Sequence, residues 1–198
     1  MAELSAESAL EELTRIFRGT NPNPEKPYSY FARAIRGGRN RLENSRVIFS
    51  EMEKHSTVIS KHVVLDDVKE FETGWKKRFP NINVYQRDAR MIRMSQYFVA
   101  DLSEESSGVG GEVGMAYYTG KPVSLFSHED ARLRPTMISY RTGDSSPTTP
   151  TIEEVFRCCG LTIPIIYFND QNVLDVVRDR FRTFFARQMV LPQYVPRR

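Results

Sequence analysis

Short apolar runs alternate with longer amphipathic stretches along most of this chain, and this alternation limits the folds open to it. Five runs have the length and composition of buried strands, at 28–35, 57–64, 97–100, 121–126 and 163–168. Helical stretches follow around 42–52, at 83–95, up to Thr119 and at 172–189. The order predicts an α/β fold: a Rossmann-like, five-stranded, mostly parallel sheet with helices on both faces. Such sheets bind ligands at the carboxyl ends of their strands.

The segments outside this alternation suggest the boundaries of one domain. Residues 1–26 form an N-terminal extension, with apolar residues at helical spacing and an Asn-Pro-Asn-Pro breaker at 21–24. We expect this short helix to dock on the domain or on a partner subunit, or to fray. The domain spans 27–190, with irregular surface segments at 65–82 and 127–151, and 191–198 is a C-terminal tail.

The charge balance excludes several partners. Lys and Arg number 28 against 25 Asp and Glu, a formal net charge of +3, so no large uniform field would hold a nucleic acid polymer or an anionic membrane.

The longest apolar runs are too short to span a bilayer. Adjacent Cys158 and Cys159 cannot build a disulfide framework, and the first twenty residues are too acidic for a signal peptide. We therefore expect a soluble protein of the cytoplasm, with the nucleus as a second compartment.

The first predicted strand ends in a basic glycine turn, Arg36-Gly37-Gly38-Arg39. Glycines let the backbone approach an oxyanion, and arginine has the charge and fork geometry that a phosphate needs. The turn therefore indicates a phosphate site. An ordinary tight turn with solvated arginines explains the same residues and stays open.

The third predicted strand runs into Ser106-Ser107-Gly108-Val109-Gly110-Gly111-Glu112. Hydroxyl and N–H groups at a helix start suit an anion, and we expect Glu112 in the first turn, where the helix dipole favours its ionised form. An ionised carboxylate beside an anion site can attack an anomeric carbon and form a covalent glycosyl intermediate. The alternative is that Glu112 only satisfies the dipole.

Two further polar residues are candidates for the same site. Asp88, on the helix over 83–95, would supply the second carboxylate that glycosyl transfer needs, or would form an exposed salt bridge with Arg87 or with a neighbouring helical arginine. His62 follows the second strand and is either a ligand contact or a packed or solvent-facing histidine. The histidines and cysteines match no zinc spacing, and both dinucleotide and P-loop fingerprints are absent, so we expect neither metal nor cofactor.

Together these motifs resemble those of one family. In chain order they are Tyr30-Phe31, Ile35-Arg36-Gly37-Gly38-Arg39, His62-Val63, Asp88, Ser106-x-Gly108-Val109-Gly110-x-Glu112-x-Gly114-x-Ala116 and Gly120-Lys121-Pro122. The chain from about 28 to 187 resembles the 2′-deoxynucleoside 5′-phosphate N-hydrolases, the Rcl branch of the nucleoside 2-deoxyribosyltransferase superfamily. Residues 27–190 would then be a nucleoside 2-deoxyribosyltransferase-like catalytic domain.

The resemblance implies a function and a set of site residues. Members hydrolyse the N-glycosidic bond of a deoxynucleoside monophosphate to free base and 2-deoxyribose 5-phosphate, as homodimers without a metal or cofactor. Glu112 would be the nucleophile, Tyr30 would lie beside it and the sugar, and Asp88 would assist the base or the sugar. The residues expected to line the phosphate, sugar or nucleotide are Ile35, Arg36, Gly37, Gly38, His62, Ser106, Gly108 and Gly110.

Several positions depart from the family pattern. Arg33-Ala34 replaces a small Gly-Ser pair, Lys61 replaces an acidic residue, Gly111 replaces an aromatic residue, and Pro135 stands where a partner's serine would reach the phosphate, although Thr136 could substitute. Two alternatives to hydrolysis therefore stay open. The first is a deoxyribosyltransferase with room for an acceptor base beside Gly111, and the second is a nucleotide-binding protein without activity in which Arg33 blocks the productive pose.

Overall fold

The centre of the molecule is a parallel sheet. The computed structural model describes residues 8, 11–12, 14–16, 25–35, 41–104, 106–133 and 163–186. Within them, five strands pair in the order β2-β1-β3-β4-β5, and every pairing is parallel. The strands are β1 (Tyr28–Arg33), β2 (Thr57–Val58), β3 (Tyr97–Asp101), β4 (Val123–His128) and β5 (Ile165–Phe168). The predicted α/β fold is confirmed, and the sheet is wholly parallel.

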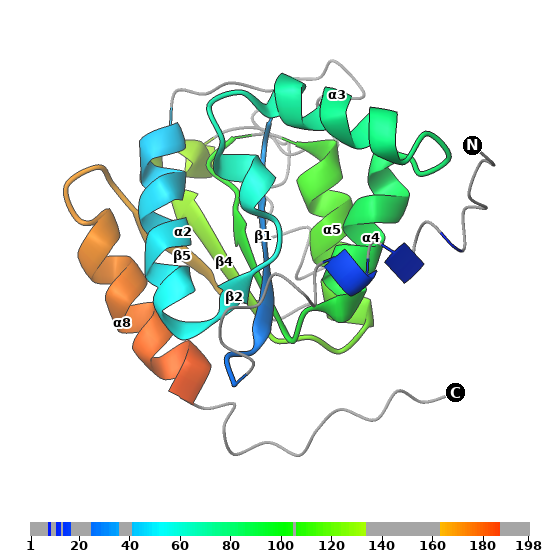
Figure 1. Cartoon of the computed structure of the whole chain (residues 1–198). Helices are drawn as coiled ribbons and strands as arrows, with labels where there is room; N and C mark the ends of the chain where they lie inside the picture. The colour runs from blue at the N-terminus through cyan, green and yellow to red at the C-terminus, as the bar shows by residue number, and fades with distance from the viewer. Residues whose placement is uncertain are drawn as a thin grey trace.

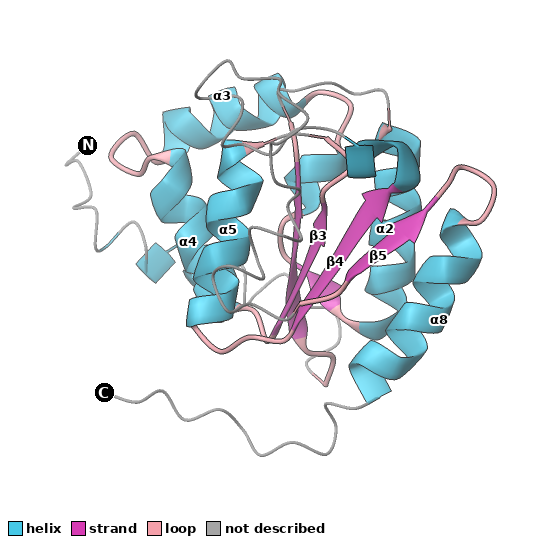
Figure 2. Cartoon of the chain, turned by 180° about the vertical axis from the view of Figure 1, so that it is seen from behind, coloured by secondary structure: helices cyan, strands magenta, loops and turns pink. Residues whose placement is uncertain are grey.

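Helices cover both faces of this sheet (Figures 1 and 2). On one face α2 (Leu42–His55) and α8 (Val173–Ala186) pack over side chains that include Phe31 and Val99. On the other, α4 (Val84–Met94) and α5 (Ser107–Tyr118) enclose a second core that includes Tyr30 and Phe98. Because side chains alternate along a strand, neighbouring residues of β1 enter opposite cores.

The second strand is shorter than the sequence predicts. Only Thr57 and Val58 pair with β1, and the chain then forms a 3-10 turn, η1 (Lys61–Val64). The Ser60 side chain explains the early exit from the sheet. Its Oγ accepts from the backbone N–H of Phe31 and donates to the Phe31 carbonyl, both at 2.8 Å. One hydroxyl thereby replaces the next rung of the ladder, and the prediction of a strand over 57–64 is wrong.

A helix occupies the segment expected to be irregular between 65 and 82. This helix, α3 (Val68–Arg78), begins where the Asp67 side chain accepts from the backbone N–H of Glu70 at 2.9 Å. Its apolar residues Val68, Phe71 and Trp75 have helical spacing. In Figure 2, α3 lies above α4 and α5, on the side toward which the strands point.

Part of the N-terminal extension docks on this helical layer. Among its described residues, Glu12 pairs with Arg78 at 3.1 Å, Thr14 accepts from Arg90 at 2.9 Å, and Ile16 packs beside the buried pair Phe79 and Ile82. The contacts confirm docking on the domain as one of the expected outcomes.

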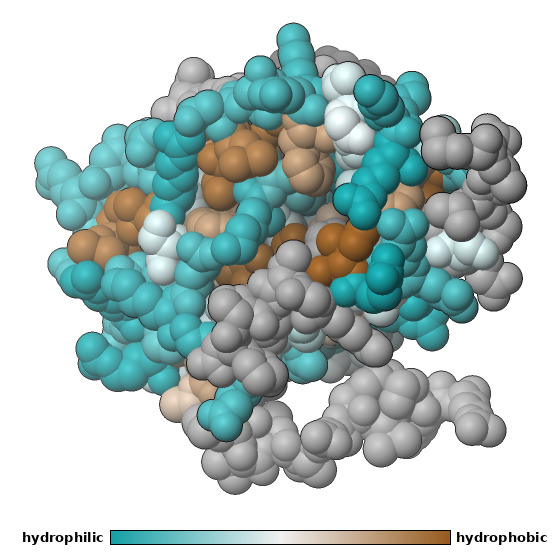
Figure 3. Space-filling model, in the orientation of Figure 1, coloured by the Kyte–Doolittle hydropathy of each residue, from teal (hydrophilic) through white to brown (hydrophobic). Residues whose placement is uncertain are grey.

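The surface of the molecule in the view of Figure 3 is mainly hydrophilic, with several separate apolar areas. No helix in the described part of the chain is long and apolar enough to cross a membrane. The predicted boundary at 190 falls outside the described residues, and the predicted boundary at 26, shortly before β1, stays a prediction.

Candidate functional site

The sheet has a topological switch point between β1 and β3. These strands are neighbours, but the chain leaves β1 through α2 toward β2 and leaves β3 through α5 toward β4, on the opposite side. Connections that diverge in this way open a crevice at the carboxyl ends of the two strands, where ligands bind in sheets of this type. Those predicted site residues that the structure describes lie on β1, η1, α4 and α5, and in the segments that follow β1 and β3.

Tyr30 and Glu112 meet on the α4–α5 side of the sheet. Tyr30 is 1% exposed, stacks on Phe98 and donates from its hydroxyl to Glu112 Oε1 at 3.0 Å. Burial, followed by the Glu112 charge, raises the Tyr30 pKa well above its usual range, so the phenol remains a donor. The contact holds one oxygen of the Glu112 carboxylate in a fixed place.

Asp88 comes to this site from α4. It is buried, and its Oδ1 accepts from Nε of the preceding Arg87 at 2.8 Å. Its charge acts on both Glu112 and Tyr30. The structure therefore brings together Tyr30, Asp88 and Glu112, three residues far apart in the chain. The ion pair of Asp88 with Arg87 exists, but it is buried instead of exposed.

Burial dominates the charge state of Glu112. It raises the Glu112 pKa to about 8, with a further increase from the Asp88 charge and smaller opposing effects of the Tyr30 hydrogen bond and of Arg87. The sequence analysis expected the helix dipole to favour the ionised form. That expectation is wrong because α5 begins at Ser107, so Glu112 is in the second turn. The dipole acts mainly on the first turn.

The loop before α5 supplies the expected polar groups. Ser106 caps the helix, since its Oγ accepts from the backbone N–H of Val109 at 3.3 Å. Gly108 and Gly110 lie in the first helical turns and are partly exposed. Ile35 follows β1 and packs against the α2–α8 core. Arg36, Gly37 and Gly38 lie outside the described residues, so their place at the site stays a prediction.

His62 is enclosed in the protein. It is buried, stacks on Phe71 with ring centroids 4.7 Å apart, and its Nε2 lies 3.1 Å from Nη2 of Arg87. Burial, with a smaller effect of the Arg87 charge, lowers its pKa to about 3. Its packing matches the packed alternative, while a contact with a nucleotide stays a prediction.

Arg33 lies on the other face of the sheet from Tyr30. It sits beside Asp101, its register partner on β3, and pairs with Glu104 at 3.6 Å. A narrow crevice on this side is lined by Arg33, Ala34, Arg41, Ser45, Asp101 and Glu104. Since alternate residues of a strand point to opposite faces, Arg33 does not fill the space beside Glu112.

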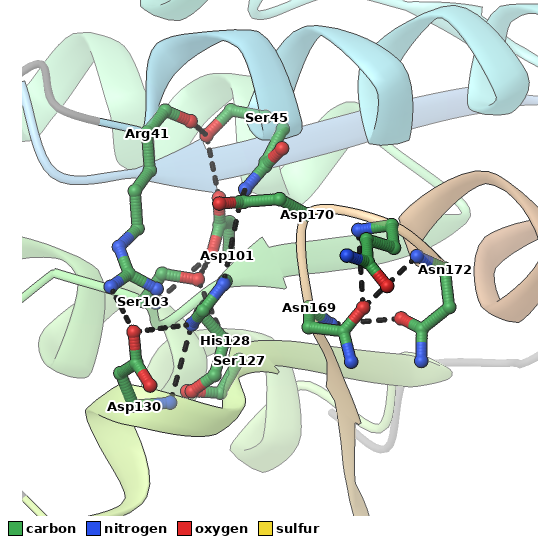
Figure 4. A network of polar contacts seen from close by, with 12 residues as sticks. Arg41, Ser45, Asp101, Ser103, Ser127, His128, Asp130, Asn169, Asp170 and Asn172 are labelled. Carbon is green, nitrogen blue, oxygen red and sulfur yellow. Dashed lines mark hydrogen bonds and ion pairs between the residues drawn. The ribbon is translucent and has the colours of Figure 1, made fainter.

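A polar network that the sequence analysis did not predict braces the strand ends on this side (Figure 4). Asp101 accepts from the hydroxyls of Ser45 and Ser103, each at 2.5 Å, and Ser103 accepts from the His128 backbone N–H at 2.8 Å. His128 Nε2 in turn lies 3.3 Å from Asp170 Oδ1. The only sequence signal was Asp-x-Ser after a strand, which is typical of a turn. No group of three or more metal-ligand side chains gathers within the described ranges.

Comparison with known proteins agrees with this geometry. The sequence profile of the family described as nucleoside 2-deoxyribosyltransferase matches residues 29–182. The chain belongs to the nucleoside 2-deoxyribosyltransferase family. The match runs from β1 into α8 and therefore includes Tyr30, Asp88 and Glu112.

Several curated relatives of this family member have names that refer to deoxynucleotide N-hydrolysis. A protein of Thermofilum pendens, provisionally named 2′-deoxynucleoside 5′-phosphate N-hydrolase 1, is 34% identical over 94 residues, which are 48% of this chain and 63% of that protein. The 5-hydroxymethyl-dUMP N-hydrolase of Mus musculus is 31% identical over 110 residues, 55% of this chain and 62% of that protein. The 5-hydroxymethyl-dUMP N-hydrolase of Tetraodon nigroviridis is 34% identical over 110 residues, 55% of this chain and 76% of that protein. The chain thus spans less than two thirds of the first two relatives.

Proposed function

We propose that this protein hydrolyses the N-glycosidic bond of 2′-deoxynucleoside 5′-monophosphates. The observation that supports this most is the constellation of a tyrosine and two carboxylates, Tyr30, Asp88 and Glu112, beside the switch point of the sheet. The family and the names of the relatives support this choice of substrate class. A substrate without a 2′-hydroxyl reaches the oxocarbenium-like transition state more easily than a riboside does.

The proposed reaction has two steps. Ionised Glu112 attacks C1′ of the sugar while the bond from C1′ to the base nitrogen breaks, and the leaving base takes its electron pair and a proton. Asp88 donates that proton, since burial raises the pKa of its carboxyl group and favours the protonated form. Water then attacks C1′ and breaks the ester bond to Glu112, while its proton returns to Asp88. This step releases 2-deoxyribose 5-phosphate and regenerates ionised Glu112.

The phosphate would bind at the ends of β1 and β3. Arg36 supplies charge, Gly37 and Gly38 allow close backbone approach, and Ser106 offers its hydroxyl hydrogen, since its oxygen already accepts from Val109. Gly108 and Gly110 would leave space for the sugar phosphate, while Ile35 and His62 would line the nucleotide. These assignments predict that Arg36→Ala raises KM for the monophosphate far more than for the free nucleoside.

Incubation of the purified protein with each deoxynucleoside monophosphate tests the proposal. We expect release of free base, measured by chromatography, and a loss of at least 10³-fold in Glu112→Gln, since the nucleophile is removed. The matched control is Tyr118→Phe on the same helix, at a side chain that is 81% exposed. Release from no substrate, or undiminished release by Glu112→Gln, would contradict the proposal, and binding without turnover would favour the nucleotide-binding alternative.

One observation favours transfer as a second candidate function. A Cβ atom placed on Gly111, next to Glu112, would meet nothing within 4 Å. This open space could admit an acceptor base. Addition of a labelled free base separates the two reactions, because a labelled deoxynucleotide forms only if the sugar is transferred.

We also propose that the protein acts as a homodimer. Helix α4 begins with two exposed apolar side chains, Val84 and Tyr85, which a second copy would cover. Sedimentation velocity should give twice the chain mass of 22.9 kDa. A monomer at micromolar concentration would contradict this assembly.

A further inference from the structure

Arg87, behind the candidate site, has an unusual environment for an arginine. It is 0% exposed, and each of its three side-chain nitrogens contacts a different residue. Nε donates to Asp88 Oδ1 at 2.8 Å, Nη1 donates to Glu72 Oε1 at 2.8 Å, and Nη2 lies 3.1 Å from His62 Nε2. We propose that Arg87 is a positioning residue that fixes the orientation and the charge of Asp88 for the reaction; this rests on the proposed function.

The planar guanidinium is held from three elements at once. Asp88 is on α4, Glu72 on α3 and His62 on η1. The rings of Phe71 and Trp75 flank the group, with centroids 5.5 and 5.4 Å from Cζ. A fork fixed at every nitrogen cannot rotate without breaking contacts to the other elements. Asp88 Oδ1 is therefore immobilised, and Oδ2 is the oxygen that Arg87 does not engage.

The hydrogen bond to His62 also fixes a protonation state. Arginine has no acceptor, so the Nε2 atom of His62 must accept and carries no proton. His62 is then neutral, in agreement with its low pKa. The charged groups facing Asp88 are therefore Arg87 on α4, Glu72 on α3 and Glu112 on α5. Since one cation stands among three acids, its loss would favour protonation of the carboxylates.

Stability alone is a poor explanation for this cluster. Burial of an ion pair costs desolvation energy that the pair barely recovers, and apolar side chains of similar volume usually stabilise a core as well or better. Arg87 also donates a hydrogen bond directly to Asp88, so its charge acts on that carboxylate without any intervening group.

The test follows the carboxylate carbons of Asp88 and Glu112 by ¹³C NMR titration in the full chain and in Arg87→Lys, Arg87→Gln and Glu72→Gln. We expect Arg87→Gln to move both titrations to higher pH, Arg87→Lys to restore most of the shift, and Glu72→Gln to move Asp88 to lower pH. Base release should fall about tenfold or more in Arg87→Gln, mainly in kcat, because less Glu112 is ionised and Asp88 loses its fixed orientation, with partial recovery in Arg87→Lys.

Opposite shifts from two variants of one cluster would not arise from a merely structural role. Unmoved titrations in folded Arg87→Gln and Glu72→Gln, or a kcat unchanged in Arg87→Gln, would overturn the proposal. If Arg87→Gln does not fold, Glu72→Gln still decides, because Glu72 is part-exposed at the edge of the cluster. The NMR titration does not depend on turnover. If the unaltered protein releases base from none of the monophosphates, the proposed function is overturned, and the titrations still decide the role of Arg87.

Discussion

At the scale of single residues, the charge of Glu112 would control the proposed reaction. The proposed nucleophile must be ionised, whereas the pKa of Glu112 is raised to about 8 by burial and by Asp88. At neutral pH most of the Glu112 in the free protein is therefore protonated. The Tyr30 hydrogen bond opposes this effect, since it stabilises the ionised form.

The first prediction concerns the pH dependence of activity. Because only ionised Glu112 attacks, kcat/KM should rise with pH through about 8, the pKa of the free enzyme. Tyr30→Phe removes a hydrogen bond that lowers this pKa, so the rise should move to higher pH, and kcat/KM at pH 7 should fall at least about tenfold. Steady-state rates from pH 5 to 10 measure both effects, with Tyr118→Phe as control. A profile shifted to lower pH in Tyr30→Phe would contradict the assignment.

The second prediction links the same group to stability. A carboxyl group whose folded-state pKa of about 8 exceeds the ordinary value of 4.5 destabilises the fold progressively as pH rises between those values. Glu112→Gln removes this penalty. Its free energy of unfolding should exceed that of the unaltered protein by roughly 4 kcal/mol at pH 8.5, and the difference should shrink to about 1 kcal/mol at pH 5. Urea unfolding at the two pH values checks the trend, and an equal difference at both would refute it.

At the scale of elements, the helices differ in what their glycines contribute. Gly74 lies inside α3, exposed, and a Cβ atom there would meet nothing within 4 Å. Gly120 follows α5 with φ at 71°, a conformation that side chains disfavour. Gly74 therefore lowers the stability of α3 although packing leaves room for a side chain there, whereas Gly120 ends α5.

The third prediction uses these two positions as a matched pair. Gly74→Ala should stabilise the protein by about 0.5–1 kcal/mol, because alanine costs less backbone entropy in a helix. Gly120→Ala should destabilise it by about 1 kcal/mol, because of the positive φ. Thermal unfolding gives both signs, and base release should be unchanged in Gly74→Ala. The same sign for both variants would show that helix propensity does not control stability here.

At the scale of the whole molecule, the N-terminal segment is joined to the layer that carries the candidate site. Ile16 packs on Phe79 and Ile82 beyond the end of α3, and Thr14 contacts Arg90 on α4. These two helices supply Glu72 and Asp88 respectively. The extension therefore supports the outer helical layer, which has only a small apolar core of its own.

The fourth prediction tests that support. Ile16→Ala should lower the free energy of unfolding by about 1 kcal/mol, because it removes apolar atoms that are partly buried against Phe79 and Ile82. It should also speed proteolysis within α3, with the exposed Glu11→Ala as control. Protection of α3 amides in hydrogen exchange measures the same coupling, and unchanged protection in Ile16→Ala would contradict it.

The sequence by itself determined the alternation of strands and helices, the parallel sheet and the residue types of the site, because strand burial and helical spacing are local patterns. It also contained the spacing of Val68, Phe71 and Trp75 that makes α3, although charge and a proline nearby obscured it. The resemblance to a known family supplied the roles proposed for Tyr30, Asp88 and Glu112.

Only the tertiary structure decided how these groups act. Burial raises the Glu112 pKa, whereas the helix dipole was expected to favour the ionised form. Desolvation depends on what packs around a carboxylate and not on its neighbours in the chain. The side of β1 on which Arg33 lies follows from the register of the sheet. The sequence suggested an exposed salt bridge between Arg87 and Asp88. In the structure, contacts with Glu72 on α3 and His62 on η1 bury Arg87, and such contacts between residues distant in sequence are not local patterns.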